Sequence, residues 1–118
     1  MCLISKWRFP KRAKKDIICY KVFMNDSTFP LRTPCMNERM YPCQIVYAHG
    51  SSLYLGRSKR QARIKTAGYI HVLSCPAVLV DAYCVYKCII PKHTKYHESI
   101  DGNEYCAEKV YITDERIY

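Results

Sequence analysis

The sequence predicts an α+β fold: a single small domain with a mainly antiparallel sheet, two short helices and a basic N-terminal arm. A chain of 118 residues has room for one core only. Hydrophobic residues make up 49% of it, which is enough to build that core. Strand-like segments are interrupted by two helix-like ones, in the order β, β, α, β, α, β, β, and this order is typical of an α+β domain.

The first third of the chain contains the arm and one strand. Residues 1–15 are expected to form the basic arm, because Pro10 is incompatible with a regular helix or a central strand and the run of cations repels itself. The folded domain is then expected to cover residues 16–118. Residues 17–24 are the first strand, since they are rich in β-branched and aromatic side chains. Residues 29–43 contain three prolines, which indicates an irregular loop or an edge segment.

The middle of the chain predicts two strands and both helices. Residues 44–49 are the second strand, and residues 68–73 are the third. Between them, residues 58–65 favour a short basic helix that begins at a serine able to cap it. Residues 74–83 predict a second, buried helix, because a proline stands at its first position and apolar side chains share one helical face.

The last third of the chain predicts the strands 85–90 and 104–112, with a short strand over residues 95–98 between them. Glu104 is a lone carboxylate at the start of the last strand, where a turn leads into the sheet. No motif of high specificity for catalysis accompanies it.

The eight cysteines are scattered and stand mostly in apolar segments, so they are expected to be reduced, buried thiols. Cys84 and Cys88 would lie about 13 Å apart on one strand, which is too far to share a metal ion. Cys75, before the second predicted helix, is the one cysteine with a reason for a lowered pKa, although a buried core thiol is the favoured interpretation. No metal site is expected.

Three histidines, His71, His93 and His97, are candidates for a metal or an acid–base role. No His-x-x-x-His helix or paired carboxylate supports them. His93 and His97 are therefore expected to lie on a surface hairpin.

The net charge of +9 is unevenly distributed. Residues 1–65 carry 14 Lys and Arg against 3 acids, whereas residues 66–118 carry 5 against 7. Such density attracts polyanions and acidic surfaces, and the alternative is a solvated face that keeps the protein soluble. The residues expected to bind are Lys11, Arg12, Lys14 and Lys15 in the arm, and Arg57, Lys59, Arg60 and Arg63 in the middle of the chain.

The chain also contains eleven tyrosines. Interleaved with Lys and Arg, they could stack on bases or anchor a protein–protein interface. They could equally cover the two faces of the sheet.

Several segments together resemble a family of small uncharacterised proteins from Bacteroidota and their phages. The resemblance covers about half of the chain and implies a phage or mobile-element origin without implying an activity. The segments that carry it are MCLISK at residues 1–6, ICYKV at 18–22, GYIH at 68–71, KCIIPKHTKY at 87–96 and NEY at 103–105.

A weaker resemblance is to ADP-ribosyltransferases, on His49-Gly-Ser, on Gly68-Tyr followed by Ala82-Tyr, and on Asn103-Glu-Tyr, in that chain order. The resemblance implies a site for NAD. His49 would orient the dinucleotide, Tyr69 would stack on nicotinamide, and Glu104 would stabilise the positive charge that develops as the glycosidic bond breaks. NAD is the only cofactor that any of these interpretations implies.

The function expected first is that of a small phage- or mobile-element-encoded accessory protein that binds an acidic partner and catalyses no reaction. The partner would be a host protein, a virion component or nucleic acid, and not a membrane, since no apolar run approaches the roughly 20 residues that span a bilayer. The protein would act in the cytoplasm of a bacterial host or with the virion. The alternative is an ADP-ribosyltransferase-like enzyme that uses NAD, or a degenerate relative without activity.

Overall fold

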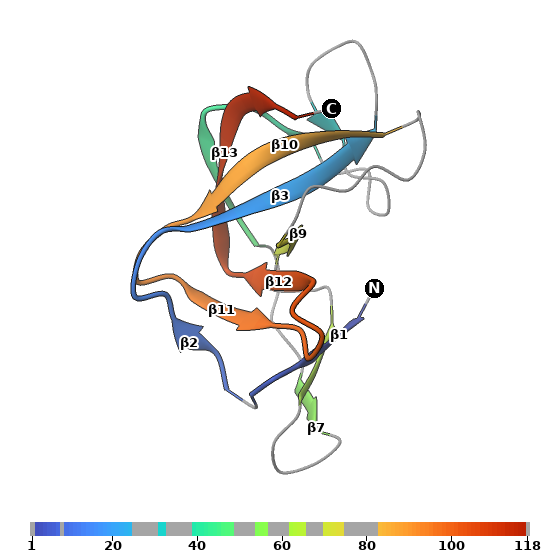
Figure 1. Ribbon diagram of the computed structural model, residues 1–118, viewed down its shortest axis with the longest axis vertical. Coiled ribbons are helices and arrows are strands. Elements are labelled where there is room, and N and C mark those ends of the chain that lie inside the picture. Colours follow the sequence, from blue (N-terminus) through green and yellow to red (C-terminus); the bar gives the residue numbers. More distant parts are fainter. Residues whose placement is uncertain are drawn as a thin grey trace.

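A computed structural model describes most of the chain, and all of its regular elements are strands (Figure 1). The described residues contain thirteen strands and no helix, so the predicted α+β fold with two helices is wrong. The described residues are 2–7, 9–24, 31–32, 39–48, 54–56, 62–65, 70–74 and 83–117.

The strands pair into three antiparallel sheets within this part of the chain. A sheet of eight strands has the order β2-β11-β12-β9-β3-β10-β13-β6, a sheet of three has the order β1-β8-β7, and β4 pairs with β5. The strands are β1 (Cys2–Ser5), β2 (Lys11–Arg12), β3 (Ile17–Met24), β4 (Leu31–Arg32), β5 (Arg39–Met40), β6 (Gln44–Tyr47), β7 (Tyr54–Gly56), β8 (Ala62–Lys65), β9 (Ile70–Leu73), β10 (Tyr83–Ile90), β11 (Lys95–Glu98), β12 (Glu104–Ala107) and β13 (Lys109–Arg116).

Residues from both predicted helices are found in strands in the structure. The first was expected over residues 58–65, but residues 62–65 are β8, the central strand between β1 and β7. A helix of eight residues is marginal by itself, whereas a central strand satisfies its backbone on both sides. Of the second, expected over residues 74–83, residues 75–82 lie outside the described part, and Tyr83 begins β10, where it pairs with Met24 of β3.

The β3–β10 pair is the longest ladder of the large sheet. Its register runs without interruption from Ile17 opposite Ile90 to Met24 opposite Tyr83. Both strands are rich in β-branched and aromatic residues, which fit a pleated surface. Cys84, Val85 and Tyr86 are consecutive and all buried, so β10 is covered on both faces.

The large sheet bends where β12 meets β13. One continuous segment forms both strands, and Glu108 between them breaks the ladder (Figure 1). The backbone N–H of Glu108 donates to Lys95 O at 3.2 Å, and its carbonyl accepts from Ala48 N at 2.9 Å. β12 therefore pairs with β11 and β9, while β13 turns away to pair with β10 and β6.

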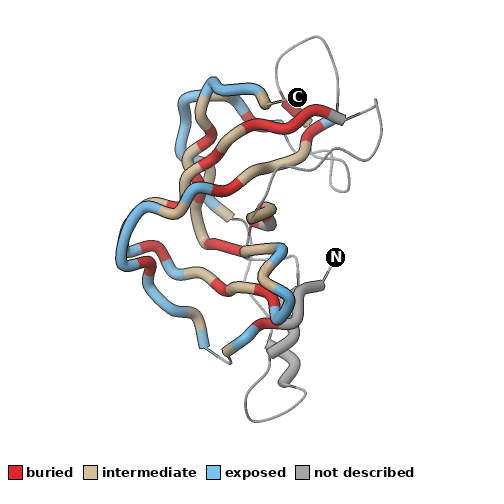
Figure 2. The backbone as a smooth tube through the Cα atoms, viewed as in Figure 1, coloured by how far each residue is buried: buried red, intermediate tan, exposed pale blue. Residues whose placement is uncertain are grey.

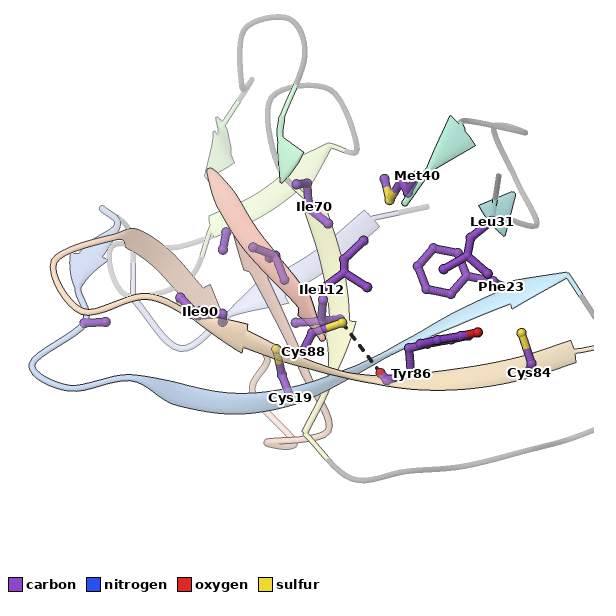
Figure 3. Packing of buried hydrophobic residues seen from close by; sticks show 14 residues of the cluster. Cys19, Phe23, Leu31, Met40, Ile70, Cys84, Tyr86, Cys88, Ile90 and Ile112 are labelled. Atoms are coloured by element: carbon purple, nitrogen blue, oxygen red, sulfur yellow. Dashed lines mark hydrogen bonds between the residues drawn. The ribbon is translucent and has the colours of Figure 1, made fainter. Parts of the chain in front are cut away.

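Many of the buried residues lie in β3, β10 and β13 (Figure 2). Phe23 lies against Tyr86 with an edge-to-face ring contact of 5.9 Å, and Leu31 and Met40 cover the same region (Figure 3). The buried apolar residues of this cluster are Ala13, Cys19, Phe23, Leu31, Met40, Ile70, Val72, Cys84, Tyr86, Cys88, Ile90, Ala107, Val110 and Ile112.

The segment expected as an arm contains two paired strands. β1 pairs with β8, and β2 pairs with β11. Ser5 also forms an isolated bridge with Ser99, which links the small sheet to the large one. In the described part of the chain, no helix is long and apolar enough to cross a membrane.

Candidate anion-binding surface

Two segments that are far apart in the sequence meet at the edge of the large sheet where β2 pairs with β11 (Figure 1). One runs from β2 toward β3, and the other runs from the turn after β10 into the start of β11. The exposed cationic residues of these two segments are together called the basic end here, and they are Lys11, Arg12, Lys14, Lys15, Lys92 and Lys95.

Backbone hydrogen bonds hold the two segments of the basic end together. Ala13 N donates to Thr94 O at 2.9 Å, and His93 N donates to Ala13 O at 2.8 Å. The Arg12 guanidinium adds a bond to His93 O at 3.0 Å. His93 has a φ of 73°, in the left-handed region, and this conformation closes the tight Pro91–Thr94 turn. The two groups of cations are thus fixed side by side.

The nearby carboxylates are occupied by backbone groups. Asp16 accepts from Lys92 N at 2.8 Å, and Glu108 accepts from Lys95 N at 3.2 Å. Among the described residues, no carboxylate holds any of the six side-chain cations in an ion pair. Six like charges on one edge attract an anionic partner and repel one another until it arrives.

Lys11, Arg12, Lys14 and Lys15, which the sequence predicts as binding residues, are exposed in the segment that begins with β2. Pairing of β2 with β11 places Lys92 and Lys95 near them, and the sequence interpretation did not include these two lysines. The second half of the chain has a net negative charge, and the sequence interpretation therefore did not treat its lysines as binding residues. The signal that could have found them is the Pro-Lys-His-Thr-Lys run at residues 91–95, where a turn between two strands carries two cations.

Aromatic rings adjoin the basic end. Trp7 packs edge-to-face on Tyr96 with ring centroids 5.7 Å apart, and its indole N–H donates to Tyr96 O at 3.4 Å. Tyr96 in turn contacts Tyr105 at 6.0 Å. The Lys11 ammonium lies 4.4 Å from the centre of the Trp7 ring, a cation–π contact.

His97 connects β11 to Ser5 and Trp7 in the corner of the fold where β1, β2 and β11 lie close together. It is fully buried, and its Nδ1 shares a hydrogen bond of 2.8 Å with Ser5 Oγ, which also accepts from Trp7 N at 3.2 Å. Burial lowers the pKa of His97 to about 4. A hydrogen bond with the Trp7 backbone raises this pKa, but its effect is smaller than that of burial. The prediction that His97 lies on a surface hairpin is therefore wrong, while His93 is exposed.

The second predicted basic cluster contributes little to the described structure. Arg57, Lys59 and Arg60 lie outside the described residues. Arg63 is in β8, where its backbone pairs with Ile4 and Leu55. It belongs to the small sheet, not to the sheet that carries the basic end.

Of the residues predicted to hold NAD, Glu104 alone is described, because His49 and Tyr69 lie outside the described residues. Glu104 begins β12 and is half-buried, and its N–H donates to Ser99 Oγ at 3.0 Å. Burial raises the pKa of its carboxyl, with a smaller contribution from the charge of Asp101. Asp101 has a lowered pKa because it accepts hydrogen bonds from Ser99 and Asn103.

The cysteines with described side chains are free thiols. Burial raises the pKa of Cys88 and of Cys106 to about 12, and that of Cys19 further still. Such thiols are poor nucleophiles. Cys75 lies outside the described residues, and so does the His71 side chain. In the part of the chain that the structure describes, no three His, Cys, Asp or Glu residues are grouped to hold a metal ion.

Comparison of the chain with protein-family models, curated proteins and solved structures finds no match.

Proposed function

We propose that this protein works by binding, and that the basic end docks an anionic partner. The observation that carries the proposal is the convergence of exposed cations from two distant segments on one edge of the sheet. Hydrogen bonds fix the backbone beneath these side chains, so binding does not have to order it. Among the described residues, no ion pair holds any of these six cations, so their charge is available to a partner.

The buried histidine and the buried cysteines favour binding over catalysis. His97 and Ser5 are close enough to share a proton, but both are fully buried beneath the corner. A general base must reach the proton that it removes. The buried cysteines are less ionised than an ordinary thiol, which is the opposite of what a nucleophile needs.

The proposed location of the protein follows from the resemblance of its sequence to small proteins from Bacteroidota and their phages. An accessory protein of a phage or mobile element would meet its partner in the cytoplasm of a bacterial host or in the virion. A host protein, a virion component and nucleic acid all present anionic surfaces, and each remains compatible with the basic end.

The test uses heparin, a polyanion that has charge but no bases. Lys14→Gln combined with Lys15→Gln removes two exposed cations of the basic end. A loss of about 1 kcal/mol per cation predicts a roughly 10- to 30-fold weaker affinity at low salt. Affinity of the unaltered protein should also fall steeply as salt rises, because bound counterions are released.

The matched control removes two cations elsewhere, with Arg39→Gln and Arg116→Gln, so that both variants have the same net charge. Arg39 lies in β5 and Arg116 ends β13. The control should keep the affinity within about twofold of the unaltered protein. Equal losses in the two variants would mean that net charge, and not the basic end, governs binding. A salt-independent affinity would contradict the proposal outright.

A further inference from the structure

An exposed aromatic ring stands in the middle of the cationic segment. The Phe9 side chain is 71% exposed, the largest value among the exposed large hydrophobic side chains of the described residues. It lies two residues from Trp7 on one side and two from Lys11 on the other. Two residues of extended chain span at most about 7 Å, so the three Cα positions are close. Because most of this residue is exposed, part of its ring can contact a flat ligand whose negative charge the neighbouring cations attract.

Trp7 is held rigidly in the same segment. Its ring makes an edge-to-face contact with the Tyr96 ring and its N–H donates a hydrogen bond to Tyr96 O, while the Lys11 ammonium lies over the Trp7 ring. A ring that already attracts a cation over its face can also stack on another π system. The edge contacts fix Trp7 in place, so stacking on it would cost little side-chain entropy.

Nucleic acid combines phosphates with flat bases, and its strandedness decides whether the bases can stack on protein. In a duplex the base faces are already stacked on one another, whereas in a single strand they are available. Proteins that bind single strands combine a basic track with aromatic side chains. The basic end and the Phe9–Trp7 segment supply both components side by side.

We propose that the anionic partner is single-stranded nucleic acid. The phosphates lie along the basic end, one base stacks on Phe9, and a neighbouring base stacks on Trp7 once Lys11 has moved from the ring face to a phosphate. This inference rests on the proposed function, since it requires the basic end to bind anions. It goes further by assigning a role to the two aromatic side chains.

The experiment compares two ligands with the same number of phosphates: an oligothymidylate and an abasic oligonucleotide of equal length. Trp7 is the only tryptophan of the chain, so its fluorescence reports directly on stacking. We expect the oligothymidylate to quench the Trp7 emission and to bind more tightly than the abasic strand. Phe9→Ala should weaken oligothymidylate binding by roughly 5- to 100-fold and leave abasic and heparin binding unchanged.

The matched control is Tyr47→Ala. Tyr47 is 60% exposed and lies in β6, at the opposite edge of the large sheet from β2. This change should leave all affinities unaltered, and Phe9→Tyr should keep tight binding.

Each other outcome has a defined meaning. Equal binding of oligothymidylate and abasic strand, with no effect of Phe9→Ala, overturns base stacking but leaves anion binding by the basic end intact. Binding of a duplex as tight as that of the single strand also overturns the inference. Binding of an acidic polypeptide but of neither oligonucleotide assigns the surface to a protein partner. Failure of heparin and of every oligonucleotide to bind overturns the proposed function itself.

Discussion

The β3–β10 pair and the β2–β11 pair belong to the same sheet, but different contacts hold them together. β3 and β10 share eight consecutive residue pairs, and their buried side chains are apolar. β2 and β11 share two pairs, and the corner around them relies on the Ser5–His97 bond, the Lys6–Glu98 ion pair and the Trp7–Tyr96 contact. The first pair provides stability, and the second presents charge to solvent.

The difference suggests how this small protein separates folding from binding. Burial of apolar area is the main source of stability, and it is concentrated where the ladder is long. The β2–β11 ladder is short and its contacts are largely polar, so local opening should cost less free energy there than along β3 and β10. Mutations in the two regions should therefore have distinct consequences.

The largest effect is expected from a cavity under the long ladder. Phe23→Ala removes a fully buried ring that packs on Tyr86, and such changes cost about 3–5 kcal/mol of the free energy of unfolding. Urea denaturation followed by circular dichroism measures it. Met24→Ala, next in the same strand but 42% exposed, is the control and should cost far less. Similar losses in both variants would mean that the ladder is not supported by this core.

A smaller effect, confined to acid, is expected from His97. The unfolded chain takes up a proton on this residue below pH 6.5, whereas the folded chain does so near pH 4. The free energy of unfolding should therefore be fully retained above pH 6.5 and fall by up to about 3 kcal/mol between pH 6.5 and 4.

Acid titration followed by Trp7 fluorescence and by circular dichroism tests this prediction. The fluorescence should change first, because Trp7 lies in the corner that His97 anchors. His97→Asn should abolish the slope over this pH range, and His93→Gln, which alters an exposed histidine, should preserve it. Titration of His97 at an ordinary pKa, seen by NMR, would contradict the prediction.

The smallest effect is expected at Thr94, beneath the basic end. Its Oγ1 is buried and has no hydrogen-bond partner in the described part of the chain. Thr94→Val replaces this hydroxyl by a methyl group and should leave the free energy of unfolding unchanged or raise it by up to about 1 kcal/mol. Thr113→Val is the contrasting variant, since Thr113 Oγ1 donates to Lys87 O at 2.6 Å, and it should destabilise by about 1 kcal/mol. Thermal unfolding of both variants distinguishes the two cases.

Local pattern identified the strands that carry a strong β signal. β3 and β11 occupy the predicted residues 17–24 and 95–98, and β10 extends the predicted strand 85–90 by two residues. The strand predicted over residues 104–112 divides at Glu108, because that residue bonds to β11 and to Ala48 at the bend. No local pattern encodes such a bend, since its cause is the position of other strands.

The short strands β1, β2 and β8 were not predicted, and the reason is related. β1, β2 and β8 are short and polar or charged in places, and they become strands only because a partner strand completes their hydrogen bonds. The candidate site shows the same limit. The four cations of residues 11–15 were recognised as a cluster, but Lys92 and Lys95 join them through pairing of β2 with β11.

Three properties can be read from the sequence without a structure: the excess of cations in the first half of the chain, the segments with a strong β-strand pattern, and the one tryptophan between basic residues. Those properties depend on composition and on near neighbours. The lack of helices in the described part, the burial of His97 and the proximity of two cationic segments depend instead on contacts between distant parts of the chain. Antiparallel pairing joins residues separated by some eighty positions, and which strands pair depends on the free energy of the whole core.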